Sequence, residues 1–153
     1  MYRKILVPLD GSELAERVLP QVEPLARCLN AELILLRVPV YAYEGAHAVS
    51  GFHGYATLPL PEERVEAIKE AHDYLDRIKQ DLVTRGLQVS TVLKEGETSE
   101  SIIEFAQTQD VDLIAMSTHG RTGLRRAIFG SVAEDVLRRT GKPVLLIRAL
   151  EHE

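Results

Sequence analysis

The chain has 153 residues, a formal net charge of −5, 45% hydrophobic residues and 27% charged residues. This composition is typical of a globular protein, and the length predicts a single domain over residues 1–153. No apolar run reaches transmembrane length, and the run before Asp10 is too short for a signal peptide, which argues against membrane and secreted proteins. The lone cysteine, Cys28, cannot form an internal disulfide, so we expect a cytoplasmic protein with Cys28 half-buried in a helix.

The first part of the chain predicts two strands with a helix between them. Residues 5–9 are an apolar run of the kind that forms a buried strand. A helical pattern follows residues 10–12, and Pro20 and Pro24 predict a kink or an interruption in it. Residues 33–38 then predict a second buried strand.

The middle of the chain predicts a long irregular segment, a helix and an edge strand. Residues 39–61 contain His47 and His53 among glycines, and we interpret these histidines as solvated loop residues rather than metal ligands. Residues 62–85 have the most regular helical pattern, and Gly86 lies where a left-handed C-cap belongs. Residues 87–93 alternate in polarity, which predicts a strand near the edge of a sheet.

The last part of the chain predicts two further strand and helix pairs. Thr98 or Ser99 is expected to cap a helix, and residues 113–116 predict a buried strand that breaks into a loop of small, polar and basic residues at 117–123. A helix starts after Gly130, and residues 143–148 predict the last strand. The alternation of strands and helices predicts a three-layer α/β/α fold with a five-stranded parallel sheet.

Residues 117–131 read STHG, nine residues and then GS. This pattern resembles the ATP-binding signature of the universal stress protein family, which is Gly-x-x-Gly, nine residues, then Gly followed by Ser or Thr. The opening KILVPLDGS and the closing KPVLLIR resemble the family in order and spacing, while Ser117 takes the place of the first glycine. The resemblance implies a Rossmann-like fold of the adenine nucleotide alpha hydrolase type. It also implies an ATP-binding stress-response protein that acts as a nucleotide-dependent signalling switch.

In a sheet of strand order 3-2-1-4-5, the order reverses between the first and fourth strands, and ligands bind outside the carboxyl ends at such a point. Residues 10–12 and 117–123 then face each other across one crevice. The free N–H groups and the dipole of the following helix favour an anion there. Six basic and two acidic residues between positions 121 and 142 give a local charge of six minus two, or +4. A solvated helix face explains these charges equally well.

The resemblance implies a set of nucleotide contacts. We expect the adenine near Pro8, Leu9 and Val38, the ribose near Asp10, Met116 and Ser117, and the phosphates near Gly120, Arg121, Gly130, Ser131 and Val132, with His119 shaping the loop. The ligand is ATP, ADP or AMP, and Mg²⁺ accompanies the phosphates, with Asp10 as its protein ligand. Nucleotide binding is expected to order residues 121–129.

Structural explanations compete with this site at two positions. Asp10 is also placed to cap the following helix together with Glu13. Ser131 and Glu134 form an S-x-x-E capping box, which explains Ser131 without any ligand. The sequence contains no P-loop, no G-x-G-x-x-G and no carboxylate cluster of a two-metal hydrolase, so any ATP hydrolysis is expected to be slow.

Family resemblance also implies a homodimer through the last strand, residues 143–148, whose apolar run would otherwise form an exposed edge. A strand buried within one subunit accounts for the run equally well. Neither nucleic acid nor a membrane is expected as a partner. Two rival functions remain: a nucleotide-free dimeric interaction module, and an enzyme such as a slow ATPase.

Overall fold

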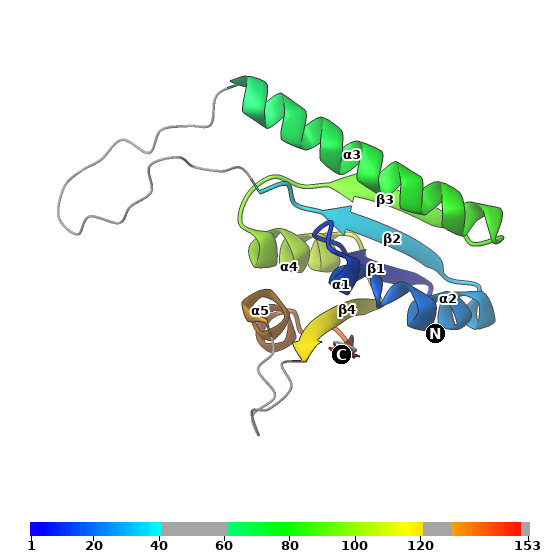
Figure 1. Cartoon of the computed structure of the whole chain (residues 1–153). Helices are drawn as coiled ribbons and strands as arrows, with labels where there is room; N and C mark the ends of the chain where they lie inside the picture. Colours follow the sequence, from blue (N-terminus) through cyan, green and yellow to red (C-terminus); the bar gives the residue numbers. More distant parts are fainter. Residues whose placement is uncertain (41–60, 121–129, 151–153) are drawn as a thin grey trace.

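The computed structural model describes residues 1–40, 61–120 and 130–150. Five strands form one parallel sheet, with the order β3-β2-β1-β4-β5 (Figure 1). This confirms the predicted α/β fold and its strand order. The strands are β1 (Lys4–Pro8), β2 (Glu32–Arg37), β3 (Val89–Leu93), β4 (Leu113–Gly120) and β5 (Val144–Leu150).

Helices cover both faces of the sheet and make the other two layers (Figure 1). One face packs against α1 (Glu13–Glu16), α2 (Leu19–Leu29) and α3 (Pro61–Thr84), and the opposite face packs against α4 (Thr98–Thr108) and α5 (Ser131–Arg139). Among the described residues, no helix is long and apolar enough to cross a membrane.

The central strand β1 is buried on both faces. Ile5 and Val7 pack with the helices on one side, whereas Leu6 packs with those on the other, and all three side chains have no exposed surface. Successive strand residues point to opposite faces, so a strand covered on both sides must be apolar at every position. This explains the continuous apolar runs in the sequence.

The helix predicted after residues 10–12 is interrupted, as the prolines indicated. It is divided into α1 and α2 around Val18, and Pro20 stands in the first turn of α2, where a missing N–H breaks no helical bond. Cys28 is exposed, so its expected half-burial is wrong. The reason is that Val22 and Ala26 form the buried stripe of α2, and Cys28 lies on the other side of the helix.

The long helix α3 ends at a left-handed glycine, as predicted. Gly86 has φ +83°, its N–H donates to the carbonyl of Val83 at 2.8 Å, and the N–H of Leu87 donates to the carbonyl of Leu82 at 3.2 Å. These two bonds form a Schellman cap, which satisfies carbonyl groups at the end of the helix.

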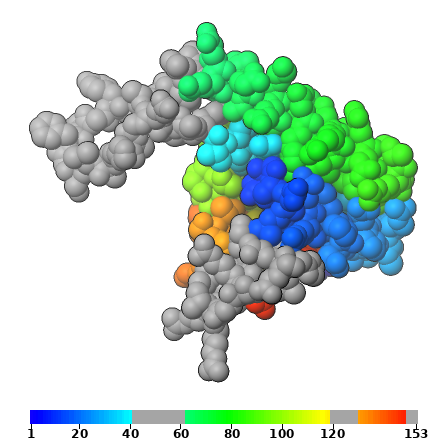
Figure 2. Space-filling view, viewed as in Figure 1, coloured from blue at the N-terminus to red at the C-terminus, as the bar shows by residue number. Residues whose placement is uncertain are grey.

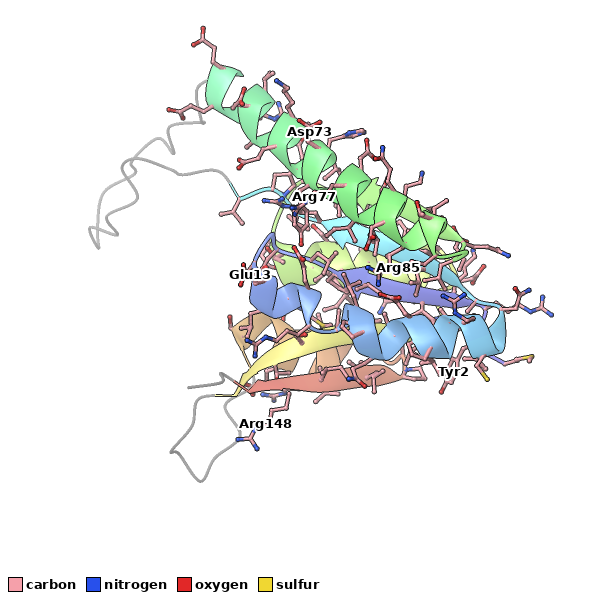
Figure 3. The ribbon with its side chains drawn as sticks, turned by 45° about the vertical axis from the view of Figure 1, so that its right-hand side comes forward. Tyr2, Glu13, Asp73, Arg77, Arg85 and Arg148 are labelled. Atoms are coloured by element: carbon pink, nitrogen blue, oxygen red, sulfur yellow. The ribbon has the colours of Figure 1, made fainter. Side chains whose placement is uncertain are left out.

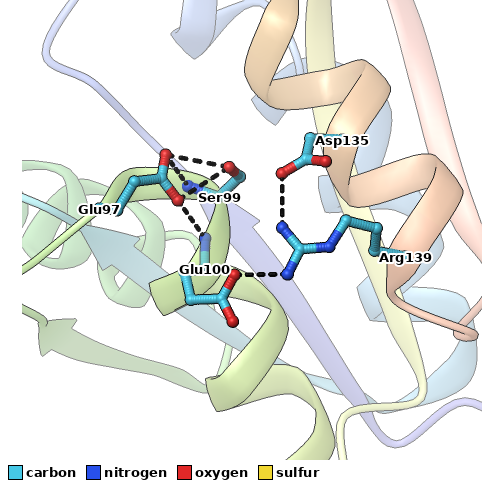
Figure 4. Close-up of polar contacts among 5 residues, drawn as sticks. All are labelled: Glu97, Ser99, Glu100, Asp135 and Arg139. Atoms are coloured by element: carbon cyan, nitrogen blue, oxygen red, sulfur yellow. Dashed lines mark hydrogen bonds and ion pairs between the residues drawn. The ribbon is translucent and has the colours of Figure 1, made fainter.

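The cap of α4 is Glu97, so the prediction of Thr98 or Ser99 is wrong. The Glu97 carboxylate accepts from the N–H of Glu100 at 2.7 Å and from the N–H of Ser99 at 3.1 Å (Figure 4). These two backbone bonds hold the pKa of Glu97 below its usual range. A glutamate has two carboxylate oxygens and can satisfy both free donors at once, whereas a single hydroxyl oxygen normally satisfies one.

Asp112 joins the start of β1 to the start of β4. One carboxylate oxygen accepts from the N–H of Arg3 at 2.8 Å and from the N–H of Lys4 at 3.0 Å. These bonds hold the pKa of Asp112 below its usual range.

Replacing Asp112 with Asn is expected to lower the free energy of unfolding at neutral pH by about 1 kcal/mol, because the charged acceptor is lost. A carboxyl whose pKa is depressed by folding stabilises the fold above its unfolded pKa of about 3.9, and the contribution is lost as the pH falls through the folded pKa. Urea denaturation is therefore expected to separate the variant from the wild type at neutral pH but not at about pH 2. An equal difference at both pH values would contradict this account.

Candidate functional site

The two halves of the sheet separate at their carboxyl ends. β1 pairs with β4 only through Ile5–Leu113 and Leu6–Ile114. Beyond these pairs, β1 stays with β2 as far as Pro8, while β4 stays with β5 as far as Gly120. The sheet therefore opens between β1 and β4, where the strand order reverses. Ligands bind at this point in sheets of this kind.

β4 is longer than predicted. The sequence suggested that the strand breaks after Met116, whereas it continues through Ser117 to Gly120, paired all the way with β5. Small and polar residues extend the strand there because β5 supplies a complete ladder of backbone partners, which side-chain composition alone does not reveal.

A pocket of about 310 Å³ occupies the opening between the strands. The ends of β1 and β2, the middle of β4, and residues of α1, α4 and α5 surround it. Its lining residues are Pro8, Leu9, Asp10, Ala15, Leu36, Arg37, Val38, Val40, Thr98, Ile102, Met116, Ser117, Gly130, Ser131, Val132 and Ala133.

The structure brings together most of the residues that sequence reasoning selected. Nine of them line this one pocket: Pro8, Leu9, Asp10, Val38, Met116, Ser117, Gly130, Ser131 and Val132. His119 and Gly120 form the end of β4, opposite Ala149 and Leu150 of β5. Arg121 lies outside the described residues.

Sequence reasoning missed several lining residues, including Leu36, Ile102 and Ala133. Each of them also belongs to the hydrophobic cluster under α4 and α5. A residue that packs in the core and also borders the pocket has the sequence pattern of a core residue. No signal in a single sequence separates these two roles.

Asp10 braces the turn between β1 and α1 rather than capping the helix. Its Oδ1 accepts from the N–H of Ser12 at 2.9 Å and from the Ser12 hydroxyl at 2.6 Å. Ser12 is the cap of α1, because its Oγ accepts from the N–H of Ala15 at 3.1 Å. The expectation that Asp10 caps this helix is therefore wrong. Within the part of the chain that the structure describes, the two hydrogen bonds from Ser12 both go to the same carboxylate oxygen of Asp10, Oδ1.

The amino end of α5 has no side-chain cap among the described residues. Gly130 is the N-cap residue, and Ser131 is already the first helical residue, so the predicted Ser131–Glu134 capping box is wrong. The first helical bond runs from the N–H of Glu134 to the carbonyl of Gly130 at 2.9 Å. Backbone donors that precede it have no helical acceptor, and together with the helix dipole they favour negative charge at this end of the helix.

Ser117 fits the backbone at its position without strain. In the described ranges, the non-glycine residues with positive φ are Asn30 and Asp110, so Ser117 is an ordinary strand residue. Its hydroxyl donates to the carbonyl of Ala15 at 3.4 Å, which links β4 to the end of α1. The serine in place of the signature glycine therefore needs no unusual backbone geometry.

The surroundings contain no preformed metal site. Among the described residues, no group of three or more His, Cys, Asp or Glu side chains is arranged to hold a metal ion. Asp10 is the one carboxylate among the described residues that line this pocket. A cation would therefore need ligands from a bound molecule as well as from Asp10.

Comparisons with known proteins agree on one family. A family model described as the universal stress protein family matches residues 1–148. Universal stress protein MJ0577 of Methanocaldococcus jannaschii is 34% identical over 155 residues, covering 97% of this chain and 96% of that protein. Universal stress protein YxiE of Bacillus subtilis is 31% identical, covering 97% of this chain and 100% of that protein. The solved structure of MJ0577 matches with a TM-score of 0.76 at 31% identity and covers 99% of both chains.

More distant solved structures carry nucleotides. The universal stress protein of Archaeoglobus fulgidus in complex with dAMP matches with a TM-score of 0.66 at 24% identity, covering 95% of this chain and 97% of that one. A universal stress protein in complex with cAMP matches with a TM-score of 0.65 at 20% identity, covering 97% and 98%. At these identities the likeness shows the fold alone, and the ligands are those of the two proteins named.

Replacing Ser12 with Ala is expected to lower the free energy of unfolding by about 1 kcal/mol, because its side chain caps α1. The matched change of Ser131 to Ala is expected to alter it by less than about 0.5 kcal/mol, since this serine caps nothing in the described structure. Urea denaturation of both variants measures the difference. A larger loss for Ser131→Ala than for Ser12→Ala would show that the caps are assigned wrongly.

Proposed function

The chain belongs to the universal stress protein family, and we propose that it binds an adenine nucleotide, ATP in particular, in the pocket between β1 and β4. The observation that carries the proposal is the convergence of the β1–α1 turn and the uncapped amino end of α5 on one pocket. Two segments far apart in sequence thus supply groups of different chemistry to one ligand. The nucleotides found in distant proteins of this fold lend general support.

The phosphates belong at the amino end of α5. Its first N–H groups need acceptors, and the helix dipole adds partial positive charge. Gly130 precedes these groups and has no Cβ, so a phosphate can approach the backbone closely. Ser131 has no capping role in the described structure, which leaves its hydroxyl able to donate to a phosphate oxygen.

The base and the ribose belong at the ends of β1 and β2. Leu9 and Val38 are buried apolar residues that border the pocket, with exposed fractions of 3% and 7%, and an adenine ring removes apolar surface from water there. Asp10 stands at the end of β1, where a carboxylate can accept hydrogen bonds from ribose hydroxyls. The volume of about 310 Å³ is at the lower end of the range for ligand pockets.

A magnesium ion fits this arrangement only together with the nucleotide. Mg²⁺ is commonly held by one or two carboxylates plus phosphate oxygens, and the described lining of the pocket provides one carboxylate, that of Asp10. When bound, the ion would neutralise part of the triphosphate charge.

We assign binding rather than rapid turnover to this pocket. Asp10 is the one carboxylate among the described lining residues, and its Oδ1 already accepts two hydrogen bonds from Ser12. A general base must be able to reach the attacking water. The role that follows is a switch, in which partner proteins respond to the nucleotide-bound form. Residues 121–129, which we expect nucleotide to order, lie outside the described residues.

We also propose a homodimer through β5. This strand is at the edge of the sheet, and its residues from Val144 to Ile147 are half-buried. An unpaired apolar edge strand is a site for pairing with another chain. Sedimentation velocity is expected to show a dimer, and a monomer at every concentration would contradict this proposal.

Replacing Gly130 with Val is expected to weaken ATP binding at least about tenfold, because the branched side chain fills the space beside the phosphates. Valine is not strained at this position, since φ of Gly130 is −56°. Isothermal titration with ATP and Mg²⁺ measures the change.

The control is Gly141→Ala, at the other end of α5. Gly141 has φ +64° and open space around an added Cβ, so this variant is expected to lose stability but to keep its affinity for ATP. ATP binding of wild-type strength by Gly130→Val would contradict the proposed site.

A further inference from the structure

Arg37, the last residue of β2, lies against Gly11 in the turn that follows β1. A Cβ atom on Gly11 would stand 2.9 Å from Nη2, 3.1 Å from Cζ and 3.2 Å from Nη1 of Arg37. Gly11 also has φ +92°, a backbone conformation that side-chain-bearing residues rarely adopt. The glycine therefore serves two purposes: it allows the turn, and it leaves room for the guanidinium group.

The other neighbour of Arg37 is the ring of Tyr74 on α3. The Arg37 Cζ atom lies 4.7 Å from the centre of that ring, which is the geometry of a cation–π contact. Partial burial raises the pKa of Tyr74, and the Glu16 carboxylate adds to the rise, so the ring remains a neutral phenol. The positive charge of Arg37 acts to lower the pKa of this hydroxyl, whereas the negative charge of Asp10 acts to raise it. In the space-filling view, the blue N-terminal segment lies against the green surface of α3 (Figure 2).

These contacts join the turn to β2 and to α3. The Ser12 cap holds the turn on the α1 side, through its bonds to Asp10 and Ala15. Arg37 packs against the same turn at Gly11, with Tyr74 behind it. Among the described residues, the contacts of this guanidinium are with Gly11 and Tyr74 rather than with a carboxylate. The Arg37 guanidinium therefore supports the turn by its shape and by stacking on the Tyr74 ring, and both require a planar group.

We propose that Arg37 is a positioning residue for Asp10: by packing between Gly11 and Tyr74, it fixes the turn so that the carboxylate meets the ribose hydroxyls of the bound nucleotide. The inference rests on the proposed function and deepens it. A carboxylate held in this position favours ligands that carry free 2′ and 3′ hydroxyl groups. Without Arg37, the glycine turn has more conformational freedom, and the carboxylate loses its alignment.

The test compares ATP with 2′,3′-dideoxy-ATP, which lacks both hydroxyls, by isothermal titration with Mg²⁺. The wild type is expected to prefer ATP about tenfold, the value of a hydrogen bond to a charged group. Arg37→Met keeps an unbranched side chain that ends near the position of Nε and lacks the planar charged group, and its preference for ATP is expected to fall close to one. Its affinity for 2′,3′-dideoxy-ATP is expected to fall much less than its affinity for ATP, because the contacts that the other lining residues make with the phosphates and the base are intact.

Arg77→Met is the matched control. Arg77 also lies over the Tyr74 ring, with Cζ 5.6 Å from its centre, and it forms an ion pair with Glu16 at 3.8 Å. In Figure 3, the Arg77 side chain lies on the side of α3 that faces the sheet. The three atoms nearest to a Cβ added on Gly11 all belong to Arg37, so the Arg77 variant is expected to keep the wild-type preference.

A second variant shows whether a result with Arg37→Met comes from a folding defect of that variant. Arg37→Lys retains the positive charge but not the planar group, and it is also expected to lose most of the preference for ATP. A wild-type preference in both Arg37 variants would overturn the inference, as would an equal loss of affinity for both nucleotides. If the wild type binds both nucleotides equally, the inference fails and the proposed function stands. If the wild type binds neither, the proposed function fails and the inference fails with it.

Discussion

The pocket exists because β1 and β4 are hydrogen-bonded only at their amino ends. Two residue pairs join them, after which each strand follows its other neighbour. In a closed parallel ladder the same space would be filled by backbone bonds. Because the strands separate, the turn after β1, the middle of β4 and the amino ends of α4 and α5 meet at one opening. Everything proposed about the ligand depends on this separation.

The two sides of this opening differ in charge. On one side, α5 presents free N–H groups and the positive end of its dipole. On the other side, Asp10 presents a carboxylate that is held by the Ser12 cap. Apolar residues such as Val38 and Ile102 also line the opening. A nucleotide carries a group that complements each of these three surfaces: an anionic phosphate chain, hydroxyl donors on the ribose and an apolar ring.

Much of this could be predicted from the sequence, because strands buried on both faces must be apolar throughout, and glycines with a special backbone recur at turns. The buried strands and Gly86 were predicted for these reasons, whereas the order of the strands came with the fold that the family resemblance implies. The N-caps of α1 and α4 were not predicted, because Ser12 and Glu97 each have neighbours with equal or higher N-cap propensity, and the cap is the side chain that reaches the free N–H groups in the folded chain. The contact of Arg37 with Gly11 was not predicted either, because it joins two strand ends that only the folded sheet brings together.

The most direct measurement is a titration of the ¹⁵N-labelled protein with ATP and Mg²⁺, followed by amide NMR shifts. The account predicts that the largest changes fall on the amides of Ser131, Val132 and Ala133, with a second group in the turn from Asp10 to Ser12. These amides report directly on phosphate at the start of α5 and on ribose beside Asp10. Unchanged shifts at saturating ATP, or changes centred on the surface around Pro24 and Arg27, would contradict the account.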